Sequence, residues 1–499
     1  MRRTQQRVWV LIALIAAFVS LGAWALSSPI GSSPDDDYHN ASIWCGQGFR
    51  DGLCEEGSEK DSVIVAKTLI ANSACFAFHP ELSGACPQSS QPTETLRSNA
   101  DGGYPPVFYW AMSWFASDNL EGSIIAMRIF NGAFAIALLA VTLSVIPREQ
   151  RRAPLVGILL TAMPLGVFVL SSVNPSSWTY VALVTFFASF TAFLKEERRA
   201  PRAAMLLAAA VSLVTSAGTR ADAGVYAVLA IALSWILAYR RGRVTPITVS
   251  ASAAFALIGF LFYRSAGQAN YWNTGSEGNG VAAFGDIASN LVNLPLLWVG
   301  IYGNSGLGWL DTVMPASVWV VGVGLCVAVL FSSMSKPSLR HSIALAAAFA
   351  AIIAVPMYML TINNVQVGAS VQPRYLLPLM ALLVAVAAYR ASRPTGFTVS
   401  NTQAVLIGIA LTLTNLISLH TNTLRYVSGN EVRSVNLDEN IDWWWASVPV
   451  SPSGVWIIGS IAFALMMVAL WRLRGPLGLV DAVDGEGHSR APGRPKLKT

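Results

Sequence analysis

Three adjacent aspartates, Asp35 to Asp37, and the nearby His39 form the strongest local chemical feature of the chain. Carboxylates in this arrangement can take a proton from a hydroxyl group, as a general base does, or bind a divalent cation through their oxygens. On a helix, residues three and four apart share a face, so Asp36 would lie beside His39 and Asn40. The tract therefore predicts acid–base chemistry, or a Mg²⁺ or Mn²⁺ site on Asp35 and Asp36.

The same tract is also typical of a helix start. Ser33 can cap the first backbone amides, Pro34 suits the first helical position, and early aspartates complement the helix dipole. Capping accounts for one or two acids, and it needs neither a third acid nor a histidine. We therefore keep Asp35, Asp36 and His39 as candidate catalytic residues.

A second segment, 103–110, combines two prolines with four aromatic side chains. One interpretation is an interfacial helix that begins at proline and carries an aromatic belt. The other is a rigid wall that orients a lipid-linked substrate. Under this second interpretation, the candidate substrate-binding residues are Tyr104, Pro105, Pro106 and Tyr109.

Arginines are the candidates for binding a phosphate, because a guanidinium group pairs with phosphate oxygens in a bidentate geometry. Arg128 lies inside an apolar run, where it either snorkels toward water or presents its guanidinium to an anion. Arg220 and Arg374 fall at the ends of apolar runs, and Tyr375 follows directly. The sequence contains no phosphate-binding Gly loop, Walker motif or metalloprotease motif, which argues against soluble-type nucleotide chemistry.

The composition indicates what must position these residues. Of the 499 residues, 54% are hydrophobic and 12% are charged, whereas a soluble domain carries about a quarter charged residues. Apolar runs of roughly 17–25 residues recur, which is the length that crosses a hydrocarbon core. The predicted fold class is therefore an all-α integral membrane protein with about 12 transmembrane helices.

The first apolar run, Val8–Leu26, could be a signal peptide, because Ala23-Trp24-Ala25 resembles a cleavage site. Its length and the interfacial Trp24 favour a retained helix. The remaining spans are expected at roughly 121–146, 154–172, 177–194, 203–218, 223–239, 246–263, 316–334, 341–361, 375–390, 402–420 and 455–471.

The net charge of +6 follows from Lys and Arg clusters between these runs, so it does not indicate a nucleic-acid partner. The clusters fall on one side of the predicted topology, and the positive-inside rule makes that side cytoplasmic. Both termini are then cytoplasmic, and residues 475–499, rich in Gly, Pro and Lys, form a disordered tail.

Residues 27–120 form the first extracytoplasmic loop in this topology. The loop holds four of the five cysteines, and an even set in one loop indicates disulfides in an oxidising compartment. Three connectivities are open, of which we predict the nearest-neighbour pairing, Cys45–Cys54 and Cys75–Cys86. A zinc site is the alternative, but the spacings are not of the C-x-x-C type and no His pair accompanies them.

Two segments of this loop, Asp61–Asn72 and Pro105–Ser117, are expected to form interfacial helices, because they are amphipathic or too short to cross. A later apolar piece, Leu291–Tyr302, is either re-entrant or interfacial.

The motif Pro34-Asp35-Asp36-x-x-His39 resembles the Pro-Asp-Glu-x-x-His opening of a bacterial membrane family known as domain of unknown function 2142. Asp36 stands where that family usually has Glu. Later stretches that resemble landmarks of the family are Asn174-Pro175-Ser176, Gly308-Trp309-Leu310-Asp311 and Arg374-Tyr375-Leu376-Leu377-Pro378.

That family is similar in turn to the GT-C class of glycosyltransferases, which use polyprenyl-phosphate donors. Tyr104-Pro105-Pro106 resembles a Pro-Pro segment of that class, although the lipid A aminoarabinose transferases carry Lys where this chain has Tyr104. The resemblance implies a GT-C-like domain over residues 1–474 in the bacterial plasma membrane, with donor-phosphate binding resting on Arg128 and Arg374.

The resemblance also implies an inverting sugar transfer to a cell-envelope acceptor hydroxyl at the extracytoplasmic face. Asp35 would accept the proton, with Asp36 as an assisting acid or a cation ligand. The implied partners are a polyprenyl-phosphate-linked sugar donor, a glycan or lipid acceptor and membrane lipids. Two alternatives stay open. A transporter or flippase predicts polar residues near the bilayer midplane, and a non-catalytic scaffold predicts that Asp35→Asn has no effect.

Overall fold

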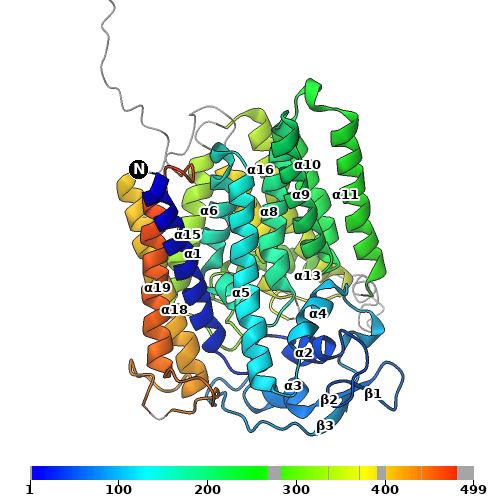
Figure 1. The fold of residues 1–499 in the computed structure, drawn as a ribbon, viewed down its shortest axis with the longest axis vertical. Helices are drawn as coiled ribbons and strands as arrows, with labels where there is room; N and C mark the ends of the chain where they lie inside the picture. The colour runs from blue at the N-terminus through cyan, green and yellow to red at the C-terminus, as the bar shows by residue number, and fades with distance from the viewer. Residues whose placement is uncertain are drawn as a thin grey trace, which may run out of the picture.

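The computed structural model describes residues 3–267, 283–334, 337–369, 371–389, 400–439 and 441–479. Most of these residues lie in long helices that run side by side, with a small mixed layer of helices and strands at one end (Figure 1). Apolar segments of this length form helices because a helix satisfies every backbone polar group within the segment, which a hydrocarbon environment requires.

Ten helical segments among the described residues are long and apolar enough to cross a membrane. They are α1 (Arg3–Leu26), α5 (Leu120–Val145), the broken segment Arg148–Leu170, α8 (Ser176–Lys195), α9 (Arg199–Ala217), α11 (Pro246–Ser265), α15 (Ala316–Ser333), α16 (Leu339–Ile362), α18 (Asn401–Val427) and α19 (Pro452–Arg472). Two shorter apolar helices are α10 (Asp222–Ala238) and α17 (Pro373–Ala388). Each coincides with a predicted span, so the polytopic helical fold is confirmed.

The broken segment contains the 3₁₀ turn η4 (Arg148–Gln150), α6 (Arg152–Thr161), the π-helical turn η5 (Ala162–Gly166) and α7 (Val167–Leu170). The break falls at Met163, whose φ and ψ of −96° and 129° are not helical, directly before Pro164. Proline cannot donate the next helical hydrogen bond, so the predicted single span over 154–172 is interrupted here.

Helices α8 and α17 form the centre of the bundle. The membrane-length window of α8 is fully buried, and every residue of α17 except Tyr375 is buried. By contrast, only 17% of the corresponding window of α11 is buried, at the edge of the bundle (Figure 1). Outer helices therefore present apolar side chains to lipid, and the two central helices are surrounded by protein.

Residues 27–119 form the layer at one end of the bundle, which we call the loop face (Figure 1). Its elements are α2 (Asp36–Trp44), β1 (Glu55–Glu56), β2 (Val63–Ala66), α3 (Lys67–Ala71), η1 (Asn72–Cys75), β3 (Pro92–Thr95), η2 (Asn99–Asp101), α4 (Val107–Met112) and η3 (Ser113–Phe115). The chain's N-terminus lies at the opposite end, which we call the basic face because it carries Arg148, Arg152 and Arg474.

The strands form an antiparallel sheet in the order β1-β2-β3, with Val63 opposite Glu56 and Thr95. This sheet corrects the prediction of an interfacial helix over Asp61–Asn72, since only Lys67–Ala71 is α-helical and Asn72 begins the 3₁₀ turn η1. Successive β2 residues alternate between buried and half-buried, and β-branched Val and Ile favour that pleated arrangement. The other expected interfacial helix, Pro105–Ser117, is present as α4 and η3.

Both predicted disulfides, Cys45–Cys54 and Cys75–Cys86, are present. The first closes a loop directly after α2, and the second ties η1 to the segment before β3. Cys326 is a buried free thiol in α15.

Three further predictions can be compared with the structure. The piece expected at Leu291–Tyr302 is divided between two short helices, α13 (Phe284–Asn293) and α14 (Pro295–Gly300). Helix α18 runs on to Val427, seven residues beyond the expected end at 420. Most of the expected disordered tail, residues 480–499, lies outside the described residues.

Candidate active site

The aspartate tract lies in a tight turn between α1 and α2. The Asp36 amide donates to the Ser33 carbonyl (3.1 Å), and the Ser33 amide donates to Asp36 Oδ2 (3.0 Å). Asp35 has a left-handed backbone, with φ of 62°. A residue in this conformation cannot be part of a right-handed helix, so α2 begins at Asp36 and the predicted start at Pro34 is wrong. The turn directs neighbouring carboxylates into different surroundings.

The Asp35 carboxylate lies between two arginines. Arg374 donates from Nη2 to Asp35 Oδ2 and from Nη1 to the Pro34 carbonyl (2.8 Å), and Arg97 Nη2 lies 3.6 Å from Asp35 Oδ1. Burial alone would raise the pKa of Asp35, but the nearby positive charges, chiefly that of Arg374, hold it below its ordinary value. The Asp35 side chain remains 33% exposed, so it is an ionised carboxylate within reach of a substrate.

Asp36 points into the protein. Its Oδ1 has no hydrogen-bond partner among the described residues, and burial raises the pKa of this carboxyl to about 7. Asp36, His39 and Asn40 are all buried, as expected for residues on one helix face. Asp37 pairs instead with Arg97, whose Nη2 lies 3.1 Å from Asp37 Oδ1.

An aromatic cluster encloses His39. His39 Nδ1 lies 2.9 Å from the Tyr109 hydroxyl, and the Tyr104 ring centroid lies 5.6 Å from that of the imidazole. Burial lowers the pKa of His39 to about 3, so the imidazole is neutral at physiological pH. Tyr38 packs against the same ring and donates its hydroxyl to Asn99 Oδ1 (3.0 Å).

The two prolines that precede α4 hold this wall in place. Pro105 is buried, Pro106 is exposed at the N-cap of α4, and the Pro106 carbonyl accepts from the Trp110 amide (2.9 Å). The Val107 amide donates to the Gly218 carbonyl at the end of α9 (3.1 Å). The segment therefore begins an interfacial helix at proline and also places Tyr104 and Tyr109 against His39.

Arg220 forms the opposite side of the cluster. It donates from Nε and Nη2 to the two carboxylate oxygens of Asp222 (3.0 and 2.8 Å) and from Nη1 to Ser176 Oγ (3.3 Å). Two guanidinium groups lie near the Tyr375 ring, whose centroid is 5.0 Å from the Arg220 carbon and 5.2 Å from that of Arg374. Opposed charges raise the pKa of Arg220, which keeps it cationic despite burial.

Three helices begin at this cluster. Ser176 opens α8, Asp222 opens α10, and Arg374 is the second residue of α17. The amino end of a helix carries a partial positive charge and free N–H groups, both of which favour an anion. The site therefore combines the partly exposed Asp35 carboxylate with two arginines, of which Arg220 is paired with Asp222, and with three helix ends.

Arg128 does not face the cluster. Its guanidinium is buried and donates to the carbonyls of Ala25 (3.0 Å), Ser28 (2.5 Å) and Pro29 (2.7 Å) and to Ser32 Oγ (3.2 Å). It neither snorkels toward water nor points at an exposed anion site. Arg128 fixes the segment that leads from α1 to the aspartate turn.

The later sequence landmarks meet at this same turn. Asn174 Nδ2 donates to the Pro34 carbonyl (3.2 Å), and Trp309 Nε1 donates to the Gly31 carbonyl (2.8 Å). Asp311 forms a buried ion pair with Arg425 of α18 (2.9 Å). Segments more than 130 residues apart in the chain are thus joined at one place.

Two functional candidates were not found from the sequence, Arg97 and Arg425. Arg97 is one of only four Lys and Arg residues between residues 27 and 104, where there are eleven Asp and Glu residues. This scarcity is the only feature of the sequence that could have indicated a role for Arg97, and it is weak. Arg425 was placed in a loop because span 402–420 was ended too early. The helix ends at Val427, because Ser428 has a non-helical backbone (φ −133°, ψ −8°) and Gly429 follows with φ of 82°.

The residues do not form a divalent cation site. The Asp35 carboxylate is bound by two arginines. The Asp36 carboxylate accepts a hydrogen bond from the Ser33 amide and does not join Asp35 in binding one ion. Across the described ranges, no group of three or more His, Cys, Asp or Glu side chains could hold a metal ion. We therefore derive no chemical step through a metal.

In a comparison with protein families, a family model described as a predicted membrane protein (DUF2142) matches residues 18–384. The matched range runs from α1 into α17 and includes the aspartate turn, the aromatic cluster, Arg220 and Arg374. No curated protein and no solved structure matches the chain.

Proposed function

We propose that this chain, which belongs to the family of predicted membrane proteins DUF2142, transfers a sugar from a polyprenyl-phosphate donor to an acceptor hydroxyl at the loop face. The observation that carries the proposal is the placement of Asp35. An ionised, partly exposed carboxylate lies beside Arg374, which contacts the same Tyr375 ring as Arg220, where three helices begin. The positive-inside rule places this face outside the cytoplasm.

The chemistry that suits these groups is a direct displacement. The acceptor hydroxyl attacks the anomeric carbon, and its proton passes to an oxygen of Asp35. The bond between the anomeric carbon and the phosphate oxygen breaks, and that oxygen keeps the electron pair. General base catalysis of this kind contributes about 10²–10⁴-fold.

The departing polyprenyl phosphate needs positive charge. Arg374 carries a buried Nε–H without a partner among the described residues, in addition to its bonds to Asp35 and Pro34. Preorganised donors aimed at developing negative charge are usually the largest contribution to catalysis. A phosphate at this place would compete with Asp35 for Arg374 and Arg97, and the exchange would free the carboxylate to accept a proton.

The distribution of buried charge favours this enzyme over a transporter. Among the described residues, the buried Asp, His and Arg side chains lie in the loop layer or near helix ends: Asp36, His39, Arg128, Arg152, Arg220, Arg374 and Arg425. A transporter would be expected to hold its substrate near the bilayer midplane, at interrupted helices, and the interrupted turn found here, Ala162–Gly166, contains no charged residue. The charged cluster at the loop face suits chemistry on a group that stays at the membrane surface.

The direct test compares Asp35→Asn with wild type, using purified full-length protein and radiolabelled polyprenyl-phosphate sugars. Asn is among the residues that tolerate a left-handed backbone, so this change removes the charge and keeps the turn. Asp61→Asn is the matched control, because Asp61 has the same φ of 62° in the same loop and its side chain is 47% exposed.

The expected result is transfer by wild type and Asp61→Asn and a loss of at least 100-fold in Asp35→Asn. Equal transfer by all three proteins would show that Asp35 is not the base. If no polyprenyl-phosphate sugar is a donor for the wild-type protein, the glycosyltransferase proposal itself fails.

A further inference from the structure

A cavity of about 270 Å³ opens between α10, α11 and α16. Apolar and aromatic side chains form most of its wall, and of the described residues that line it Asp222 alone is charged. The volume lies just below the range of sites for drug-sized molecules, about 300–1,000 Å³. The cavity therefore suits part of a long molecule better than a whole small one.

The cavity lies just inside the helix ends at the loop face. Asp222 begins α10, and Tyr263 lies in the last turn of α11. The Gly267 amide, after α11, donates to the Gly102 carbonyl (2.9 Å), which places this end of α11 against the loop layer. On α16 the lining begins at Ala354, in the last third of the helix, so the cavity reaches roughly 12 Å into the bundle at 1.5 Å per residue.

The outer side of the cavity meets lipid. Val225 of α10 and Tyr358 of α16 both line the cavity and are 49% and 55% exposed, and Ala354 is exposed one turn before Tyr358. These residues belong to apolar helices of the bundle, so their exposed side chains face hydrocarbon. A lipid chain can therefore enter the cavity from the bilayer without passing through water.

The inner side of the cavity leads to the charged cluster. The Tyr226 hydroxyl lies 3.2 Å from Asp222 Oδ2 and 3.4 Å from the Tyr375 carbonyl oxygen. Asp222 in turn accepts from Arg220 through both carboxylate oxygens, and the Tyr375 ring contacts the guanidinium groups of Arg220 and Arg374. Two lining residues are therefore in direct contact with the groups that suit a phosphate.

We propose that this cavity binds the first part of the polyprenyl chain of the donor, next to its phosphate. The chain lies along Val225, Val355 and Met359, and the phosphate lies at Arg220 and Arg374. A phospholipid carries two chains on one glycerol, whereas a polyprenyl phosphate is a single chain joined directly to phosphate, which suits a cavity that holds only part of a chain. The inference rests on the proposed function for the identity of the lipid, and it adds where the donor enters the protein.

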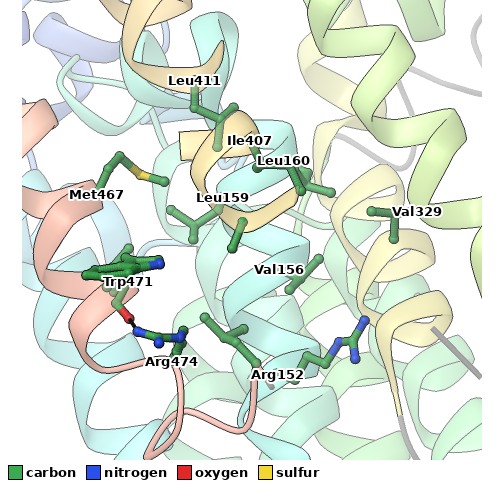
Figure 2. A pocket seen from close by; sticks show the side chains of 13 residues that line it. Arg152, Val156, Leu159, Leu160, Val329, Ile407, Leu411, Met467, Trp471 and Arg474 are labelled. Carbon is green, nitrogen blue, oxygen red and sulfur yellow. Dashed lines mark hydrogen bonds between the residues drawn. The ribbon is translucent and has the colours of Figure 1, made fainter. Parts of the chain in front are cut away.

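The first experiment maps the lipid on the wild-type protein. Purified full-length protein in phosphatidylethanolamine–phosphatidylglycerol nanodiscs is irradiated with a polyprenyl phosphate that carries a diazirine near its phosphate end, and the labelled residues are identified by mass spectrometry. A second apolar groove, at the basic face, is the internal control, and Figure 2 shows Leu159 and Met467 in its wall. We expect label on the residues of α10, α11 and α16 that line the cavity. Equal labelling of the groove at the basic face would overturn the proposal.

The second experiment measures binding of polyprenyl phosphate without a sugar, by native mass spectrometry. Val225→Trp fills the cavity, and Val228→Trp is the matched control, because Val228 is 46% exposed on the same helix and does not line the cavity. Loss of burial of a few methylene groups should weaken binding at least tenfold in Val225→Trp, and Val228→Trp should bind as wild type does. Equal binding by the two variants, or displacement of the lipid by an equal concentration of phosphatidylglycerol, would overturn the proposal.

Failure of this inference can be told apart from failure of the proposed function. If the chain occupies the cavity and no sugar is transferred, the lipid site stands and the glycosyltransferase proposal fails. If Val225→Trp binds the lipid and transfers sugar as wild type does, the transfer stands and the cavity is not the lipid site. Absence of binding to the wild-type protein would overturn both.

Discussion

Replacing Asp36 by Asn should make the protein more stable at neutral and alkaline pH. Asp36 is buried with one oxygen unpartnered, and its pKa is raised to about 7 from an ordinary value of 3.8. The folded chain therefore holds this proton more tightly than the unfolded chain. As pH rises from about 4 to 7, the unfolded chain ionises first, and the free energy of unfolding falls.

The size of the effect follows from the two pKa values. About three pKa units between the folded and unfolded chain correspond to roughly 4 kcal/mol at 1.36 kcal/mol per unit, fully lost above pH 7. About 2–3 kcal/mol of this loss falls between pH 5 and pH 8. Asn keeps an acceptor for the Ser33 amide and cannot ionise, so the variant should lack this dependence.

The assay is unfolding of the purified protein in mixed micelles at pH 5 and pH 8, followed by tryptophan fluorescence. The quantity compared is the free energy of unfolding of Asp36→Asn minus that of wild type, since other titrating groups cancel in this difference. It should increase by about 2–3 kcal/mol from pH 5 to pH 8. Sugar transfer, by contrast, should survive the change, because Asp36 does not face the cluster.

Asp61→Asn is again the control, because an exposed loop substitution is expected to alter stability by less than about 0.5 kcal/mol. If the difference between Asp36→Asn and wild type were the same at both pH values, the pKa of Asp36 would not be raised. If the variant stopped sugar transfer while folding normally, Asp36 would act in the chemistry and the division of roles between Asp35 and Asp36 would be wrong.

Two further predictions concern the arginines. Arg374→Lys keeps the charge but removes the planar guanidinium group that bonds both Pro34 and Asp35. Initial rates of sugar transfer should therefore fall about 100-fold. A fall of less than fivefold would contradict this role of Arg374. The lysine in Arg128→Lys cannot make all four hydrogen bonds of Arg128. The variant should therefore lower the free energy of unfolding by about 1–3 kcal/mol and leave the KM for the sugar donor unchanged. A raised KM at unchanged stability would instead show that Arg128 binds the donor.

The helical part of the fold could be predicted because each membrane-spanning helix is determined by its own stretch of sequence. A run of apolar residues long enough to cross a bilayer must satisfy its own backbone, so each long run became a helix near its predicted place. This requirement does not apply to the residues of the loop layer. Whether Val63–Ala66 is strand or helix depends on its partners β1 and β3, which the local sequence does not contain.

Several members of the candidate site could be predicted from the sequence, but the contacts between them could not. Asp35, Tyr109, Arg220 and Arg374 were all chosen from residue type and position, and the structure brings them to one cluster. Arg97 could not be chosen, because nothing in its neighbourhood indicates that it lies against Asp35, 62 residues earlier.

The aspartate tract also shows why local propensity was an incomplete guide. The capping explanation put Asp35 and Asp36 in the first turn of one helix, where they would share one environment. The left-handed backbone at Asp35 breaks that pattern and delays the helix until Asp36. A non-glycine residue in this conformation costs of order 1 kcal/mol or more, and it persists only where the surroundings enforce it.

What enforces the turn is the set of contacts made from distant helices. Arg374 and Asn174 both bond the Pro34 carbonyl, and Arg128 holds the segment just before it. With the backbone fixed in this way, Asp35 is turned outward to the arginines and Asp36 inward to Ser33. Adjacent carboxylates in one helix turn would raise each other's pKa, whereas here one is kept ionised and its neighbour is protonated below about pH 7. Tertiary contacts acting on a single strained residue therefore keep Asp35 ionised at neutral pH, while its neighbour Asp36 is protonated below about pH 7 and adds no repulsion there.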